Sequence, residues 1–90
     1  MARHARTFLI VNALGLHARA AAQLVQLANR YRSEVHVEKD GTEVNGKSIM
    51  GVLTLAASRG SAVLVSCEGP DAADAMAAIA RIFESGFGEK

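Results

Sequence analysis

The sequence predicts an α+β fold in which helices cover one face of a small antiparallel sheet. Four short segments are rich in β-branched or alternating apolar residues, and three longer segments repeat apolar residues at helical spacing. They follow one another in the order β-α-β-β-α-β-α, for which a single sheet covered on one face is the simplest packing. Residues 1–90 are therefore expected to form one domain.

The expected strands lie between turn signals. They are residues 7–11, 34–38, 42–44 and 62–68. The second strand alternates strictly, which predicts that Val35 and Val37 point inward. Asp40-Gly41 is a hairpin signal, so the next strand is expected to return antiparallel to it.

The expected helices are residues 18–30, residues 48–57 and a last helix opened by Gly69-Pro70-Asp71. Two of them have one apolar face at i, i+3, i+4, i+7 spacing, formed by Ala21, Leu24, Val25 and Ala28 and by Met76, Ile79, Ala80 and Phe83. Asp71 and Asp74 suit a cap and the positive end of the helix dipole. Residues 85–88 are expected to fray.

Charge and composition exclude several classes of function. Lys and Arg number 10 against 9 Asp and Glu, a formal net charge of +1, which gives no basis for nucleic-acid binding or a basic membrane anchor. The apolar run at residues 8–11 is too short for a signal peptide or a membrane span. Cys67 is the one cysteine, so no internal disulfide can form and a reducing, cytoplasmic location is predicted.

The start of the first helix breaks a local rule. Residues 15–19 offer no Ser, Thr, Asp or Asn at the cap position, and Arg19 places a cation in the first turn. The free N–H groups there are expected to lack a side-chain acceptor. A bound anion would remove both defects, because the N–H groups, the dipole and Arg19 all favour negative charge. Such breaches tend to mark functional sites.

His17 adds a nucleophile at the same position. A neutral imidazole is available near pH 7 and can accept a phosphoryl group. Gly15 allows a positive φ and keeps the approach open. Candidate catalytic residues are therefore His17 and Arg19, and candidate phosphate-binding residues are Gly15, Ala18 and Arg19. The alternative, a surface histidine near a helix end, stays open.

The other histidines are expected to be solvated. His4 falls in an N-terminal segment predicted to be mobile, and His36 faces outward on its strand beside Glu34 and Glu38. Because the histidines are scattered and the cysteine is single, no metal-ligand spacing is present. No metal or cofactor is expected.

The second helix carries more apolar surface than one core face can use. Its apolar residues form two sets at i, i+3, i+4 spacing: Val52, Leu55 and Ala56, and Ile49, Met50 and Leu53. If one set faces the core, the other forms an exposed patch suited to a partner protein. The alternative is that a deeply wedged helix buries both.

Ser48 is placed to cap the second helix. A phosphate on Ser48 would also suit the helix dipole and would put negative charge beside the apolar residues, so Ser48 is a candidate regulatory switch. Residues 41–48 match the P-loop pattern G-x-x-x-x-G-K-[ST]. Their context disfavours nucleotide binding, because Gly41 falls in a hairpin turn and Glu43 would put an acid beside the triphosphate.

Two motifs resemble the HPr family, the histidine-containing phosphocarriers of the phosphoenolpyruvate-dependent phosphotransferase system. They are Gly15-Leu16-His17-Ala18-Arg19 followed by three alanines, and Gly46-Lys47-Ser48-Ile49-Met50-Gly51-Val52. The resemblance runs over about residues 7–83. It implies an open-faced β-sandwich, with a four-stranded antiparallel sheet and three helices on one face.

The resemblance also implies roles for single residues. His17 would be phosphorylated on Nδ1 by Enzyme I and discharged to an EIIA-type protein, with Arg19 assisting at the phosphate. Ser48 would be the serine that an ATP-dependent HPr kinase/phosphorylase modifies in many members. The implied partner contact is the apolar set Ile49, Met50 and Leu53. Such a protein is expected to be a monomeric carrier of phosphoryl groups rather than a free-standing enzyme.

One position departs from the family, which usually has proline where Ala20 stands. Proline suits the first turn of a helix, whereas alanine keeps the helix and adds an N–H. The departure leaves open the detailed geometry of the helix start. It also leaves open whether the protein belongs to the carbohydrate or the nitrogen-related branch of the phosphotransferase system. A rival hypothesis is a regulatory binding module switched at Ser48, with His17 idle and no role in sugar transport.

Overall fold

A computed structural model describes residues 2–89, in the predicted order of elements. The elements are β1 Arg3–Leu9, α1 Ala18–Ala28, β2 Glu34–Lys39, β3 Thr42–Asn45, α2 Ile49–Thr54, β4 Ala62–Glu68, α3 Ala72–Glu84 and the 3₁₀ turn η1 Gly86–Gly88. Within residues 2–89, no helix is long and apolar enough to cross a membrane.

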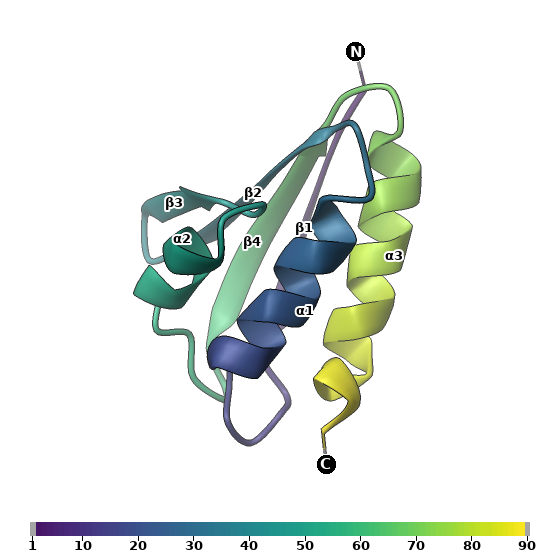
Figure 1. The fold of residues 1–90 in the computed structure, drawn as a ribbon. Coiled ribbons are helices and arrows are strands. Elements are labelled where there is room, and N and C mark those ends of the chain that lie inside the picture. The colour runs from purple at the N-terminus through teal and green to yellow at the C-terminus, as the bar shows by residue number, and fades with distance from the viewer. Residues whose placement is uncertain (1, 90) are drawn as a thin grey trace.

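The four strands form one sheet in the order β1-β4-β2-β3, and every neighbouring pair is antiparallel. Figure 1 shows α1 and α3 side by side in front of the sheet, with α2 beside β3. This arrangement confirms the predicted α+β fold and the open-faced β-sandwich that the resemblance implied. The opposite face of the sheet carries polar side chains such as His36.

The core lies between the sheet and the helices, and the sequence periodicity located most of it. Val35 and Val37 are buried, as the alternation predicts. All eight residues of the two predicted helix faces are buried as well. Asp40 and Gly41 both have positive φ, which is the geometry of the predicted tight hairpin between β2 and β3.

The first strand begins earlier than predicted. Residues 3–9 form β1, and His4 pairs with Cys67 instead of lying in a mobile terminus. This strand is at the edge of the sheet and mostly exposed, so its polar residues gave no apolar signal. Ile10 lies past the strand, where its N–H donates to the Ser61 carbonyl at 2.8 Å.

The second helix is shorter than predicted. It ends at Thr54, and Ala56 has a left-handed φ of 49°, which no α-helix can continue through. Val52 and Leu55 are buried as one of the two predicted sets requires, but Ala56 is exposed. The prediction that Ala56 shares the buried face was therefore wrong.

The prediction of a frayed tail was also wrong. Phe87 is buried and packs its ring edge-on against Phe83, with centroids 5.1 Å apart. Phe83 in turn stacks on Phe8 of β1 at 4.8 Å. Gly86, Phe87 and Gly88 all have positive φ, so the chain reverses after α3 and returns toward the start of α1. Figure 1 shows both at the same end of the molecule.

Asp71 does not cap α3 with its side chain, contrary to the sequence prediction. Its carboxylate instead accepts from the Arg32 N–H at 2.9 Å, the Ser33 N–H at 2.9 Å and the Ser33 hydroxyl at 2.6 Å. These bonds tie the start of α3 to the loop between α1 and β2. The Ser33 and Arg32 donors lower the pKa of Asp71 from 3.8 to about 2.

This depressed pKa predicts a defined acid sensitivity. The Asp71 carboxylate stabilises the fold above about pH 4, and that contribution is lost as the pH falls toward 2. Asp71→Asn should therefore lower the melting temperature at pH 7, and the variant and wild type should converge near pH 2. Thermal unfolding followed by circular dichroism between pH 7 and 2 measures this. Asp74→Asn, an exposed carboxylate on the same helix, is the control, and an equal loss there would contradict the assignment.

Candidate functional site

The loop before α1 is fixed by a close backbone contact. Gly15 has a φ of +67°, and the N–H of Leu16 donates to the Ala57 carbonyl at 2.8 Å. A Cβ at Gly15 would clash with that carbonyl oxygen and lie 2.9 Å from the Ser58 Cα. Gly15 is buried, so its role in the structure is to let two loops approach, rather than to leave space for a ligand.

His17 is the N-cap of α1, which corrects the expectation that the helix start lacks a side-chain acceptor. Its Nδ1 accepts the backbone N–H of Arg19 at 3.2 Å, and its carbonyl accepts the N–H of Ala21 at 2.8 Å. A ring nitrogen thus does what a serine or asparagine oxygen does at other helices. Sequence reasoning missed it because histidine is not among the favoured cap residues.

The other ring nitrogen of His17 meets the C-terminal segment. Nε2 is hydrogen-bonded to Oε2 of Glu89, and the second Glu89 oxygen accepts from Nδ2 of Asn12 at 2.9 Å. The same Asn12 nitrogen donates to the Gly15 carbonyl at 2.8 Å. Neither Asn12 nor Glu89 was a predicted site residue, and for Glu89 the sequence offered no signal.

These contacts determine the tautomer of the neutral ring. Nδ1 accepts a backbone N–H, so it carries the lone pair, and the proton lies on Nε2 and is donated to Glu89. Hydrogen bonding from Asn12, with His17 and the charge of Arg19 adding to it, lowers the pKa of Glu89, so this carboxylate is ionised at neutral pH. The unprotonated nitrogen, Nδ1, therefore faces the N-terminus of α1.

The first turn of α1 is prepared for an anion. It contains no acidic residue, and Ala18 and Arg19 are exposed, whereas Ala20 is fully buried. The first helix-type hydrogen bond is made by the Ala21 N–H, so the amides before it are not used by the helix itself. An anion on Nδ1 would meet these amides, the helix dipole and the Arg19 guanidinium.

Apolar residues are exposed on α2, as one of the two alternatives requires. Ile49 is 41% exposed and Met50 is 72% exposed, while Leu53 is half-buried and packs against the core. Leu14, in the loop before His17, is 70% exposed and was not predicted. Helices α1 and α2 contact each other, and Nδ2 of Asn29 at the C-terminus of α1 donates to the Lys47 carbonyl just before α2 at 3.4 Å.

Ser48 caps α2 as predicted, because its hydroxyl accepts the Gly51 N–H at 3.1 Å. The segment with the P-loop pattern does not form one continuous loop. Gly41 lies in the β2–β3 hairpin, and residues 42–45 are strand β3. The predicted hairpin and strand, the context that disfavours nucleotide binding by this motif, are therefore confirmed.

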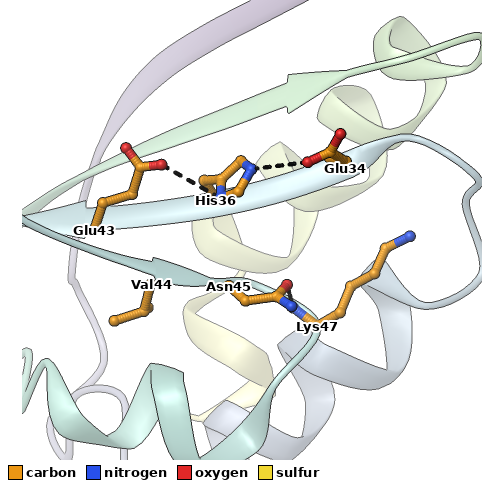
Figure 2. A pocket seen from close by; sticks show the side chains of 6 residues that line it. All are labelled: Glu34, His36, Glu43, Val44, Asn45 and Lys47. Carbon is orange, nitrogen blue, oxygen red and sulfur yellow. Dashed lines mark hydrogen bonds and ion pairs between the residues drawn. The ribbon is translucent and has the colours of Figure 1, made fainter.

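A separate hollow lies on the β2–β3 hairpin. Figure 2 shows its lining, with His36 between Glu34 and Glu43 at 3.4 and 3.3 Å. Lys47 turns away, and its ammonium donates to the Tyr31 carbonyl at 2.7 Å. His36 is thus paired with carboxylates rather than simply solvated. Two carboxylates make this hollow a poor site for phosphate.

Comparison with known proteins identifies the family of this chain. Residues 4–85 match the family model described as the PTS HPr component phosphorylation site. The chain belongs to the HPr family. Within the family it is 48% identical over 84 residues to the phosphocarrier protein HPr of Cupriavidus necator, covering 93% of this chain and 94% of that one.

Other relatives agree in fold and sequence. A crystal structure of an HPr from Thermoanaerobacter tengcongensis superposes with a TM-score of 0.93 at 46% identity, covering 97% of this chain and 98% of that one. The chain is also 50% identical over 70 residues to the HPr-like protein Crh of Halalkalibacterium halodurans, covering 78% and 83% of the two chains. The family is therefore that of the phosphocarrier protein HPr.

The loop geometry makes Gly15→Ala a test of the site's scaffold. The substitution should lower the free energy of unfolding by about 1–3 kcal/mol, because it combines a left-handed φ with a clash against the backbone of residues 57–58. Gly60→Ala is the matched control: φ is +89°, but nothing lies within 4 Å of the added Cβ. Denaturant unfolding measures both, and equal losses would show that the close approach is unimportant.

Proposed function

We propose that this protein carries phosphoryl groups on His17, accepting them from Enzyme I and passing them to EIIA-type proteins. The observation that carries the proposal is the position of Nδ1: an unprotonated ring nitrogen at the N-terminus of α1, where its lone pair accepts the Arg19 N–H. Membership of the HPr family supports the general role.

The transfer needs little from the protein beyond orientation and charge. The Nδ1 lone pair attacks phosphorus, the N–P bond forms, and the bond to the donor's leaving group breaks with its electron pair. The Arg19 N–H, which now bonds to Nδ1, is then free to donate to a phosphoryl oxygen. An N–P bond is reactive enough for onward transfer. Until that transfer, the helix dipole stabilises the negatively charged phosphoryl group.

Ala20 is compatible with this role. The helix starts at Ala18 without proline, and Ala20 packs fully buried in the core. Its amide hydrogen is one more donor in the first turn that a proline would lack. The departure from the family pattern therefore changes the number of donors near the phosphoryl group, and the nucleophile stays in place.

The exposed apolar residues are the proposed contact for Enzyme I and EIIA-type partners. Ile49 and Met50 are solvated in this structure, with Leu53 at the edge of the core. A small exposed apolar patch suits a partner that binds briefly and leaves. A carrier of this kind is expected to act as a monomer in the cytoplasm.

Phosphorylation with Enzyme I and phosphoenolpyruvate tests the proposal. The wild type should gain one acid-labile phosphate, and His17→Asn should gain none, although asparagine keeps an N-cap acceptor and so protects the fold. Arg19→Gln should slow the reaction about tenfold or more. His36→Ala is the control and should be labelled like the wild type. Labelling of His17→Asn would show that the assignment is wrong.

Ser48 supports the second candidate, a module regulated by serine phosphorylation. The hydroxyl is at the start of α2, next to Ile49, so a phosphate there would place charge beside the proposed contact. The candidate source of that phosphate is an HPr kinase/phosphorylase. If Ser48 were the main site, an acid-stable phosphate would appear there and His17 would stay unlabelled.

Ser48→Asp tests whether charge at Ser48 affects partner binding separately from phosphoryl transfer at His17. Aspartate keeps the cap and adds charge, so the KM for phosphorylation by Enzyme I should rise about two- to fivefold with little change in kcat. Thr42→Asp, on the exposed start of β3, is the control and should leave both constants unchanged. Steady-state phosphoryl transfer measures both constants. An unchanged KM in Ser48→Asp would remove Ser48 from the partner contact.

A further inference from the structure

We infer that Glu89 is a positioning residue for phosphoryl transfer, held against the His17 ring by the C-terminal segment. This inference rests on the proposed function. It adds Glu89, which lies outside the start of α1, to the residues of the site. Two independent contacts place Glu89: one carboxylate oxygen bonds Nε2 of His17 and the other accepts from Asn12. The pair is largely shielded, since the side chains of His17 and Glu89 are 25% and 19% exposed.

The fold around Glu89 holds it in place. Phe87 is buried against Phe83, two residues before Glu89, and the Glu89 N–H donates to the Gly86 carbonyl at 3.0 Å. On the other side, Asn12 is 2% exposed and its amide nitrogen bonds both Glu89 and Gly15. One side chain thus joins the loop that positions His17 to the segment that carries Glu89.

The chemistry gives this contact a role in the transfer. A neutral ring with its proton on Nε2 becomes positively charged when Nδ1 forms a bond to phosphorus, because Nε2 keeps its proton. The Nε2–H group is hydrogen-bonded to the Glu89 carboxylate, so the carboxylate pairs with the positive charge of the ring as this charge develops. The donor's leaving group departs with its electron pair, and no other proton moves at the ring.

Glu89 also faces the correct side of the ring. Its carboxylate bonds Nε2, while Nδ1 faces the amide of Arg19, so the carboxylate and the phosphoryl group would occupy opposite nitrogens. The two negative groups therefore do not compete for one position. Arg19 is the nearby cation that also favours the ionised form of Glu89. The arrangement favours the phosphorylated ring over the free one.

A competition at equilibrium tests the inference. Equal amounts of 15N-labelled wild type and unlabelled Glu89→Gln are mixed with a trace of Enzyme I and half an equivalent of phosphoenolpyruvate, and phosphate on each is read by intact mass spectrometry. The wild type should hold about two- to tenfold more phosphate, the range for one lost hydrogen bond. Starting from either protein already phosphorylated should give the same ratio.

Variants separate a positioning role from a structural one. Glu89→Asp keeps the charge on a shorter side chain and should restore part of the wild-type share, whereas loss of packing would not be rescued. Glu84→Gln, an exposed glutamate near the end of α3, should compete equally with the wild type. If His17 is labelled but Glu89→Gln holds as much phosphate as the wild type, or more, the inference is overturned. If neither protein is labelled on His17, the proposed function itself fails.

Discussion

The hydrogen bond from the Arg19 N–H to Nδ1 of His17 is the interaction on which the site depends. In the proposed function, one lone pair serves both the fold and the phosphoryl transfer. In the free protein, that lone pair satisfies an amide that α1 leaves without a partner. When the lone pair binds phosphorus, the phosphoryl oxygens can accept from the same amide. A helix cap is then exchanged for a stronger, charged cap, so the scaffold need not rearrange during transfer.

Distant parts of the chain keep this bond in place. The backbone of residues 57–58 leaves no room for a side chain at Gly15, so the loop enters α1 in one conformation. Asn12 ties the same loop to Glu89, and the ring stack of Phe8, Phe83 and Phe87 holds the segment that carries Glu89. The position of one imidazole therefore depends on β1, on the loop before β4 and on the chain after α3.

Periodicity predicted the parts of this molecule that bury an apolar face. Val35, Val37 and the apolar faces of α1 and α3 were found because burial repeats at the spacing of the element. The polar half of β1 was missed, since an exposed edge strand needs only pairing with β4 and leaves no apolar pattern. The buried Phe87 was missed because a single aromatic between glycines has no period at all.

The site was predictable in its helix start and unpredictable in its long-range contacts. The missing cap residue before α1 drew attention to His17, and the ring itself turned out to be the cap. Asp71 is a second example of a contact that its local sequence did not predict. Its position suited a helix cap, but its carboxylate accepts a hydrogen bond from a loop 38 residues earlier. Local rules identify which groups need a partner, and only the fold decides which partner they find.

The negative charge of Glu89 beside a site for phosphate needs a physical explanation, because like charges repel. The explanation lies in the two sides of the imidazole ring. In the proposed transfer, phosphorylation at Nδ1 makes the ring a cation whose remaining N–H points at Glu89. The carboxylate would then lie next to this positive charge and be separated from the phosphoryl group by the ring. Salt and solvent weaken the longer interaction more than the direct hydrogen bond. An acid in the first turn of α1 would repel the phosphoryl group, whereas Glu89, on the far side of His17, would stabilise the charged ring.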